Sequence, residues 1–556
     1  MTETAYDPFA DARKAASVIV LRDLPEPGVE VLMLRRAERD GDQRGGATVF
    51  PGGVLDPRDR EAHPHCLGWD DFSASRALNL AHGGLDYLVA AARECFEEVG
   101  LLFAHELSPQ ALRKAHAQWR QPLQRGELCI AALCDELGLR IDLSDWAYFS
   151  HWLTPPGVPK RFDTRFFVAR APQGQAAEAD GGEAVELMWL TPAQALDPAR
   201  GLKLLPVTRR TLQVLGGFAS AQAALDHARA QQAVPLTMPR RAESSRGQRV
   251  VLPDEHAWAE IGRIDPSGQL TAHADIVPGR VVRLSPRMIR VTAPNAGMMT
   301  GPGTNSYLVG CPVTNRWTAI DPGPADPGHL QALCAAAPGP IEQILVTHTH
   351  ADHSPGAALL SAITAAPVLG RLADHPQGQD ASFAPQRELA GGELLILGPD
   401  TALQVLHTPG HASNHLCYLL SAEKTLFTGD HVMQGSTVVI NPPDGDMTAY
   451  LVALRGLLSL DIDWLAPGHG FLVARPHEVV RALIQHRLAR EARVVQALQA
   501  RAADGPVPLD DLLQQVYADV PAGLHPVARR SLLAHLLKLQ ADGLAALQGE
   551  CWVLSG

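Results

Sequence analysis

Short apolar runs separated by Gly and Pro make up most of the first part of the chain. Residues 16–21 and 29–34 are two such runs with a Pro- and Gly-containing break between them, which predicts a β-hairpin. Residues 161–170 and 184–190 alternate apolar and polar positions as strands do, whereas residues 85–103 have the spacing of a helix. This mixture of strands and helices predicts an α/β sandwich.

A second series of strand-like and helical patterns follows a stretch of different composition. Residues 235–276 are interpreted as a linker with a small β excursion, because residues 239–249 are basic, polar and poor in apolar residues, as expected of a solvated connector. Strand-like runs then return, among them residues 317–320, 341–346 and 403–406, and each ends at a polar residue. Helical patterns fill the C-terminal end, and a short β pattern follows them. We therefore predict four segments, which are residues 1–235, a linker at 236–277, 278–476 and 477–556.

Composition limits the class of protein. A chain of 556 residues with 46% hydrophobic and 19% charged residues is long enough for two or three folded domains. Its formal net charge of -12 provides no overall basic field for nucleic acid. The eight cysteines form no Cys-x-x-Cys pair, the acidic N-terminus lacks the apolar core of a secretory signal, and no uncharged apolar run approaches ~18 residues. We therefore expect a cytoplasmic protein without a membrane span.

Four potential metal ligands follow the apolar run that ends at Val346. They are His348, His350, Asp352 and His353, which lie within six residues of one another. A loop after a buried strand allows them to converge, and imidazole with carboxylate suits zinc and similar transition metals. A solvated His-rich loop is the alternative, but it rarely has a hydrophobic strand before it and further ligands after it.

Three more candidates follow strand-like runs farther along the chain. His411 lies in a Thr-Pro-Gly-His turn, Asp430 ends Leu-Phe-Thr-Gly-Asp, and His469 lies in a Pro-Gly-His-Gly turn. Each follows an apolar run and a glycine, an arrangement that places ligands at one edge of a sheet. Five other histidines lack this placement and are interpreted as structural or solvated, namely His375, His407, His415, His431 and His477. Of these, His407 and His431 are also considered as supporting groups for the ligands.

A second type of candidate site lies in the predicted helix of residues 85–103. Glu94, Glu97 and Glu98 have the i, i+3, i+4 spacing that places three carboxylates on one helix face. Their mutual repulsion is relieved by a divalent cation such as Mg²⁺. A solvated acidic face is the alternative interpretation.

The helix carries a family resemblance. Arg93-Glu-Cys-Phe-Glu-Glu-Val-Gly100, with Gly-Gly upstream at 52–53, resembles the second half of the Nudix box, in the branch that includes coenzyme A and acyl-CoA diphosphatases. The resemblance spans about residues 12–215. It implies that Glu94, Glu97 and Glu98 hold Mg²⁺ or Mn²⁺, with Glu97 also assigned a catalytic role. Two features depart from the family: about thirty residues separate Gly53 from the helix, and Leu85 stands where the box has a further glutamate.

The second set of ligands resembles the metallo-β-lactamase superfamily, whose pattern is His-x-His-x-Asp-His followed by a single His, Asp and His. By this resemblance His348, His350 and His411 bind a first zinc, and Asp352, His353 and His469 bind a second. Asp430 bridges the two. A hydroxide between the cations would be the nucleophile, and Asp352 would orient it.

Within that superfamily, Gly303-Thr-Asn-Ser-Tyr-Leu-Val309 and Ala466-Pro-Gly-His-Gly470 are similar to the lactamase-β-like endoribonuclease branch. The C-terminal helices and the short wing at 544–554 resemble a winged-helix module. Arg529 and Arg530 would either meet phosphates or belong to a module that only caps the mouth of the site.

Together the resemblances imply an α/β multi-domain protein. It would join an N-terminal Nudix α/β/α sandwich to a C-terminal metallo-β-lactamase αββα sandwich with a small winged-helix-like module. We expect a metal-dependent hydrolase that cleaves single-stranded RNA or an ester or thioester, fused to a diphosphatase-like domain. Two alternatives stay open: a bifunctional enzyme acting on acyl-CoA, or a Nudix half that is catalytically silent and senses a ligand.

Overall fold

The computed structural model describes residues 6–38, 45–182, 184–503 and 505–555. The chain divides into two compact units, one comprising residues 1–241 and 267–269 and the other residues 242–266 and 270–556. Each unit has its own sheets and its own hydrophobic cores.

The first unit is built around one mixed sheet. In the described residues its main path runs β10-β3-β2-β1-β8-β7-β11, with β4 paired to β1 and β9 paired to β2. The strands of this sheet are β1 (Ala12–Asp23), β2 (Val29–Arg36), β3 (Ala47–Val49), β4 (Gly52–Val54), β7 (Trp146–Leu153), β8 (Arg161–Arg170), β9 (Ala184–Leu190), β10 (Lys203–Leu204) and β11 (Leu236–Thr237). Long β1 and β8 pair in parallel at its centre.

Helices cover both faces of this sheet. One face packs on α2, whose Leu85 and Leu88 join Val18 and Val20 of β1 in a single core. The other face carries α8, which contacts β1, β7 and β8. The helices of this unit are α1 (Asp71–Ala77), α2 (Gly84–Val99), α3 (Pro109–Gln118), α4 (Arg120–Gln124), α5 (Ile130–Leu137), α6 (Pro192–Leu196), α7 (Pro206–Leu215) and α8 (Ala221–Ala230), with η1 (Pro57–His65), η2 (Pro198–Arg200) and the short pair β5 (Cys66–Leu67) and β6 (Ile141–Asp142). The predicted α/β/α sandwich is confirmed.

The second unit contains two sheets packed face to face. The first has the order β14 (Val281–Ser285), β15 (Met288–Thr292), β16 (Asn305–Cys311), β17 (Arg316–Ile320), β18 (Ile341–Leu345), β19 (Val368–Gly370) and β20 (Arg387–Glu388). The second has the order β21 (Leu394–Gly398), β22 (Thr401–His407), β23 (Leu416–Leu420), β24 (Thr425–Gly429), β25 (Trp464–Pro467) and β26 (Val473–Ala474), and η3 (Ser421–Glu423) joins β23 to β24. Strand β22 alternates buried and half-buried side chains, the pattern of a strand with one face on a core.

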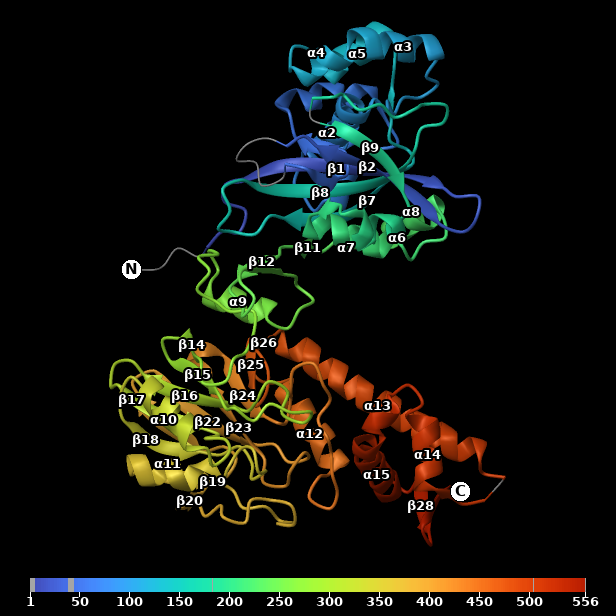
Figure 1. Ribbon diagram of the computed structural model, residues 1–556. Helices are drawn as coiled ribbons and strands as arrows, with labels where there is room; N and C mark the ends of the chain where they lie inside the picture. The colour runs from blue at the N-terminus through green and yellow to red at the C-terminus, as the bar shows by residue number, and fades with distance from the viewer. Residues whose placement is uncertain (1–5, 39–44, 183, 504, 556) are drawn as a thin grey trace. The chain divides into compact units, whose positions relative to one another are not determined.

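Helices form the outer layers of this unit. The core between the sheets includes Tyr307, Leu403 and Phe427. On one outer face α10 (Pro327–Ala336) and α11 (Gly356–Thr364) cover the first sheet, and on the other α12 (Met447–Leu457) and α13 (Pro476–Ala500) cover the second. Figure 1 shows α10 and α11 on the opposite side of the paired sheets from α12. The predicted αββα sandwich is confirmed.

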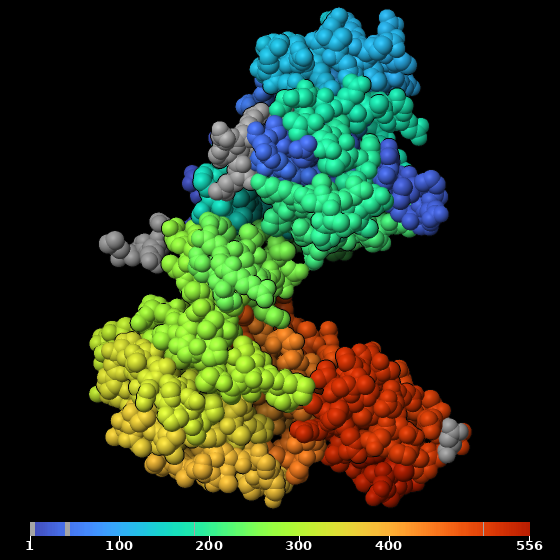
Figure 2. Space-filling model, viewed as in Figure 1, coloured from blue at the N-terminus to red at the C-terminus, as the bar shows by residue number. Residues whose placement is uncertain are grey.

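The C-terminal module packs directly on this sandwich. It consists of α14 (Leu509–Val516), η4 (Ala522–Leu524), α15 (His525–Ala541) and a small sheet of β27 (Val507–Pro508), β28 (Ala545–Gln548) and β29 (Cys551–Leu554). Ala534 of α15 lies in the same core as α12 and Val480 of α13. In Figure 2 the red surface of the module continues into the orange surface that precedes it in the chain.

The stretch interpreted as a linker has structure of its own. Residues 236–277 contain β12 (Arg240–Ala242), β13 (Arg249–Val251) and α9 (Trp258–Ile264). Glu260 of α9 is buried and pairs with the buried Arg290 of β15 at 2.6 Å and 2.9 Å. A desolvated arginine requires such a partner, so α9 is an integral part of the second unit. No helix in the part of the chain that the structure describes is long and apolar enough to span a bilayer.

Candidate metal centres

Strand ends from both sheets of the second unit bring the predicted ligands together. His348, His350, Asp352 and His353 follow β18 in the first sheet. His411 follows β22, Asp430 follows β24, and His469 follows β25 in the second sheet. Three overlapping groups of donor atoms each lie within 4.8 Å of one another, and together they include all seven residues; these groups are His348 with His350 and His411, His348 with His353 and Asp430, and Asp352 with His353 and His469.

The first group consists of ring nitrogens. Nδ1 of His350 lies 2.9 Å from Nε2 of His348 and 3.0 Å from Nε2 of His411. Nδ1 of His411 donates to the carbonyl of Val439 at 2.7 Å, so in a neutral ring the lone pair is at Nε2. Three imidazole nitrogens at this separation cannot all donate to one another, but they can share one cation.

The second and third groups share His353 and mix imidazole with carboxylate. Nε2 of His353 and Nε2 of His469 each lie 3.3 Å from Oδ2 of Asp352. Oδ1 of Asp430 is 3.4 Å from His353 and 3.3 Å from His469, whereas its Oδ2 is 3.7 Å from Nε2 of His411. The two oxygens of Asp430 therefore face different groups, as a bridging carboxylate requires.

The donor atoms of the second and third groups fit a cation. Oδ1 of Asp430, Nε2 of His353 and Nε2 of His469 are buried and have no hydrogen-bond partner in the described residues. Buried polar atoms without partners are costly, and here they point at one another. Imidazole and carboxylate are a donor set for zinc and related divalent metals. The residues present therefore fit a pair of divalent ions.

Burial and charge set the protonation of the rings. Burial and the neighbouring imidazoles lower the pKa of His348, and they lower that of His350 to about 3. These two rings are neutral, the form that binds metal. Burial has the same tendency at His469, but the charge of Asp430 and contact with Asp352 raise its pKa to about 9. A proton and a metal ion therefore compete for Nε2 of His469.

Asp321, at the end of β17, holds this arrangement and received no role in the sequence analysis. Its carboxylate accepts from the Thr347 amide at 2.7 Å, from the Thr347 hydroxyl at 2.7 Å and from Nδ1 of His353 at 2.9 Å. It thereby fixes the proton of His353 on the far side of the ring from the cluster. The signal that could have identified it is its position, since it follows an apolar strand as the ligands do.

His415 also contacts the ligands, although the sequence gives no sign of it. Its buried ring stacks on His348 at 5.1 Å, and its Nε2 accepts from the backbone amide of Asp430 at 3.2 Å. His407 is exposed and bonds the Ser413 carbonyl, whereas His431 is buried against Tyr450. His415, which the sequence analysis interprets as structural or solvated, is therefore the histidine that contacts the ligands, whereas His407 bonds the Ser413 carbonyl instead.

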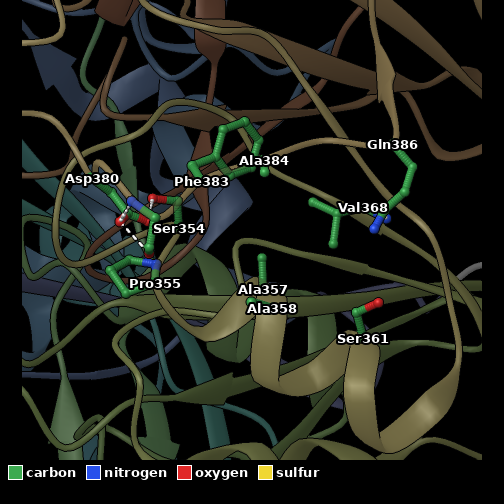
Figure 3. A pocket seen from close by; sticks show the side chains of 11 residues that line it. Ser354, Pro355, Ala357, Ala358, Ser361, Val368, Asp380, Phe383, Ala384 and Gln386 are labelled. Atoms are coloured by element: carbon green, nitrogen blue, oxygen red, sulfur yellow. Dashed lines mark hydrogen bonds between the residues drawn. The ribbon is translucent and has the colours of Figure 1, made fainter.

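A pocket of about 250 Å³ lies beside the ligand loop (Figure 3). Its wall includes Ser354, the residue after His353, and the hydroxyl of Ser354 donates to Asp380 at 2.7 Å. Phe383 and Val368 provide apolar lining. None of the seven candidate ligands lines this hollow, so it is separate from the donor cluster.

The candidate centre of the first unit is organised around Arg93 of α2. Its guanidinium donates to Glu94 at 2.9 Å and to Glu97 at 3.3 Å, and it also bonds the Val54 carbonyl at 3.0 Å. Glu98 accepts from the Gly52 amide at 2.9 Å. Burial raises the pKa of Glu97 to about 7. Among the described residues, no trio from this helix meets the 4.8 Å spacing of the histidine cluster.

Close approach of the chain requires glycine at position 53. A Cβ there would lie 2.3 Å from the carboxylate of Glu94, so any side chain would displace it. The resulting cradle of carboxylates and backbone fits Mg²⁺ or Mn²⁺, which prefer oxygen donors.

Asp59 supplies a carboxylate that the box lacks. Leu85, at the position of the missing glutamate, is buried in the core. Asp59 of η1 is buried and accepts from Nε of Arg93 at 2.8 Å and from its Nη2 at 3.2 Å. The long insertion before the helix thus provides the counter-charge of Arg93. Sequence reasoning missed Asp59 because it lies far from Arg93 in the chain and in no recognisable motif.

A pocket of about 410 Å³ adjoins this centre. Val54, which contacts Arg93, lines it together with three cationic side chains, Arg13, Lys14 and Arg60, and with the carboxylates of Asp56 and Asp86. Asp86 neutralises part of this charge through Arg60 at 2.9 Å. The remaining positive charge suits an anionic ligand.

The C-terminal arginines lie outside the donor cluster. Arg529 pairs with Asp510 at 2.7 Å, and both side chains are exposed. In contrast, Ser531, Ala534 and His535 of the same helix α15 are buried. The longest helix of the module therefore packs into the second unit, and its inward face is closed to a nucleic-acid groove.

Comparison with known families identifies all three parts. The family model described as the metallo-beta-lactamase superfamily matches residues 299–469. A model for the NUDT19 Nudix domain matches residues 73–204, and one for the beta-lactamase associated winged helix domain matches residues 509–552. The predicted fusion is thus confirmed.

Sequence relatives agree with the metallo-beta-lactamase match. An atrochrysone carboxyl ACP thioesterase of Aspergillus chevalieri is 32% identical over 294 residues, which are 50% of this chain and 89% of the relative. A beta-lactamase-like protein 2 homolog of Drosophila melanogaster is 29% identical over 47% of this chain and 91% of the relative. A crystal structure of a Nudix hydrolase from Alicyclobacillus acidocaldarius is 26% identical over 40% of this chain and 98% of that chain, with a TM-score of 0.33.

These matches and the described geometry establish a metal-dependent hydrolase fold in each unit. The chain belongs to the metallo-β-lactamase superfamily, with a NUDT19-type Nudix domain before the metallo-β-lactamase domain and a winged helix domain after it.

Proposed function

We propose that the second unit hydrolyses a thioester at a centre of two divalent metal ions, with zinc as the expected metal. The observation that carries this proposal is the buried Asp430, whose two oxygens face the two groups of histidines and whose Oδ1 lacks a partner. His348, His350 and His411 would hold one ion, and Asp352, His353 and His469 the other. Bound there, the ions would polarise the carbonyl and lower the pKa of a water.

The protein groups define the course of the reaction. Water adds to the thioester carbon, the C–S bond breaks, and the sulfur leaves as a thiol after taking a proton, so a carboxylic acid and a thiol result. The side chain of Asp352 is 25% exposed, and the charge of His353 outweighs burial to hold its pKa below the usual range. Its ionised carboxylate would orient the attacking water by accepting a proton in a hydrogen bond.

An apolar loop beside the cluster favours an acyl substrate. Met298 and Met299 are 75% and 50% exposed. The loop that carries them leads into Gly303, whose carbonyl accepts from His469, and Thr304, whose hydroxyl donates to Asp352 at 3.3 Å. Exposed methionines form adaptable apolar contacts, whereas a phosphodiester backbone would require cations at this position. The name of the thioesterase relative supports the same choice.

We further propose that the first unit hydrolyses a small-molecule diphosphate with Mg²⁺ or Mn²⁺. Glu94, Glu97 and Glu98 would hold the ion, and the pocket containing Arg13 and Lys14 would bind a second anionic group of the substrate. The product set is two monophosphates, formed when water adds to one phosphorus and the P–O–P bridge breaks. This activity would make the Nudix half a catalyst rather than a sensor.

The thioesterase proposal is tested with a series of acyl-CoA substrates of increasing chain length, with release of free thiol as the readout. We expect zinc-dependent turnover that increases with chain length and depends on His348. A Met298→Ser/Met299→Ser double variant should raise KM for long chains and leave acetyl-CoA turnover unchanged. Metal-dependent cleavage of a single-stranded RNA oligonucleotide without thioester turnover would replace this proposal by the nuclease alternative.

A further inference from the structure

Three consecutive residues connect the histidine cluster to the C-terminal module. The carbonyl of Val439 accepts the Nδ1 proton of His411 at 2.7 Å. On either side of it, the carbonyl of Val438 accepts from the Arg487 guanidinium of α13, and the amide of Ile440 faces the hydroxyl of Ser531 of α15 at 3.5 Å. The segment 438–440 is therefore held by the C-terminal helices on one side and holds a candidate ligand on the other.

The surroundings keep this segment in place. The side chains of Val438 and Ile440 are buried in the core that α12 shares with Val480 and Ala534. Figure 1 shows α12, α13 and α15 close to one another, and the three helices contact pairwise. The Arg487 guanidinium lies 5.5 Å above the ring of Tyr450, whose hydroxyl donates to the His431 carbonyl. Movement of α13 or α15 would therefore move the Val439 carbonyl.

The Val439 contact determines which nitrogen of His411 is available. A neutral imidazole carries one proton, and donation from Nδ1 leaves the lone pair at Nε2, the atom 3.0 Å from His350. If the carbonyl shifted, the His411 ring would be free to rotate or to change tautomer. Loss of such an outer partner typically weakens metal binding about 10- to 100-fold.

We propose that Arg487 and Ser531 are positioning residues for the metal centre, and that α13 and the C-terminal module together fix the orientation of His411 through residues 438–440. The proposal rests on the proposed metal site but not on the identity of the substrate. It assigns the winged-helix module a role inside the hydrolase, because Ser531 lies on α15 of the module and faces the same segment that Arg487 of α13 holds.

Arg490 offers a matched control. It lies one turn farther along α13 and is similarly buried, but it donates to Val516 at 2.6 Å and to Asp519 at 2.8 Å, both within the C-terminal module. Replacing either arginine by methionine keeps the apolar stem and removes the donors. Both changes should lower thermal stability, but only Arg487 reaches the segment that contacts His411.

The experiment measures zinc affinity of the full chain by competition with a chromophoric chelator, together with the unfolding temperature. We expect Arg487→Met to weaken one of two zinc sites about tenfold, Ser531→Ala to have a smaller effect, and Arg487→Lys to recover most of the affinity. Arg490→Met should bind both ions as the unmodified chain does. The inference is overturned if Arg487→Met retains both affinities, or if Arg490→Met loses as much.

The metal measurement separates this inference from the proposed thioesterase activity. A chain that binds two zinc ions and shows the predicted loss in Arg487→Met, yet releases no thiol from acyl-CoA, would exclude the substrate assignment alone. A chain that folds but binds no divalent ion would exclude both. Should Arg487→Met not fold, Ser531→Ala provides the affinity comparison in milder form, with Arg487→Lys as the variant that is expected to retain affinity.

Discussion

The two candidate metal centres differ in how the charges of their buried side chains are balanced. In the second unit, supporting groups such as Asp321 and Val439 bind only the far sides of the rings. Three buried atoms there face one another without hydrogen-bond partners in the described residues, namely Oδ1 of Asp430, Nε2 of His353 and Nε2 of His469. In the first unit, Arg93 lies among the carboxylates and bonds two of them. The aspartates of the histidine cluster thus have imidazoles as their charged partners, whereas the glutamate helix contains a permanent cation.

This difference has a thermodynamic meaning. A cluster of unpaired donors gains much from a bound ion, because the ion satisfies atoms that are otherwise buried without partners. A cluster already paired with an arginine gains less, because the ion competes with an existing ion pair. We therefore expect tight, structure-forming metal binding in the second unit and weaker, exchangeable binding in the first.

Removal of the bridging carboxylate should give the largest effect. Asp430→Asn keeps the shape of the side chain but removes its charge, so thioester kcat/KM should fall about 1,000-fold, at the upper end of what loss of one preorganised electrostatic group causes. Diphosphatase activity should not change, because Asp430 belongs to the other unit. His375→Ala, at an exposed histidine, is the control; equal losses in both variants would contradict the assignment.

The corresponding change in the first unit should be smaller. Glu97→Gln should lower turnover of coenzyme A or ADP-ribose about 100-fold, because one of three carboxylates for the cation is lost. Thioester hydrolysis measured in the same sample should be unaffected. Full diphosphatase activity in this variant would show that the glutamate helix is not the catalytic centre and would favour the sensing alternative.

Metal removal tests the comparison directly. If free metal stands at about 100 times the dissociation constant, one bound ion adds about 2.7 kcal/mol to the free energy of unfolding. Chelation should therefore destabilise the second unit by at least this amount and the first unit by less. Hydrogen exchange followed by mass spectrometry assigns the loss to each unit. Greater deprotection around α2 than around β18 would reverse the expected ranking.

Asp59 allows a finer test of the first centre. Asp59→Asn removes the counter-charge of Arg93 and should weaken Mg²⁺ binding about tenfold, by analogy with other outer partners, because the guanidinium then draws on Glu94 and Glu97 instead. The control is Asp163→Asn, which breaks another buried aspartate–arginine pair, with Arg165 at 3.0 Å, away from the glutamates. Both variants should be destabilised, but only Asp59→Asn should change the magnesium titration.

The control variant Asp163→Asn should show the smallest of these effects, a change in how the free energy of unfolding depends on pH. Burial tends to raise the pKa of Asp163, but the bond to His151 and the charge of Arg165 hold it below its ordinary value of 3.8. A carboxyl group whose pKa is lowered by folding stabilises the fold at pH values above its pKa in the unfolded chain. This stabilisation is lost as the pH falls through its pKa in the folded protein. Denaturation curves of the unmodified chain and Asp163→Asn should therefore converge as the pH drops below 3.8.

The histidine cluster was predictable from sequence because its ligands share a local context. Each follows an apolar strand, so strand recognition and residue type together located His411 and His469 without a structure. Asp321 was not assigned and His415 was interpreted as structural or solvated, because their roles arise from contacts across the cluster. Asp321 holds Thr347 and His353 from a neighbouring strand, and no local pattern records that contact.

The same limit explains Asp59 and Glu260. Asp59 lies in a polar stretch and Glu260 in the stretch interpreted as a linker, yet both are buried against an arginine that is distant in the chain. Composition predicts exposure for an isolated carboxylate but cannot identify its partner. Polar residues within an insertion or an apparent linker are therefore the positions at which sequence reasoning is most often insufficient.

The location of the histidine cluster also constrains when the protein can acquire metal. His348 and His350 belong to the first sheet, whereas His411, Asp430 and His469 belong to the second, so neither sheet alone presents a complete set. During synthesis the last ligand, His469, follows the whole first sheet and strands β21 to β25 of the second, and the segment that supports His411 still awaits α13 and α15. We therefore expect stable metal loading to be late in folding, and we expect a truncated chain to bind zinc poorly.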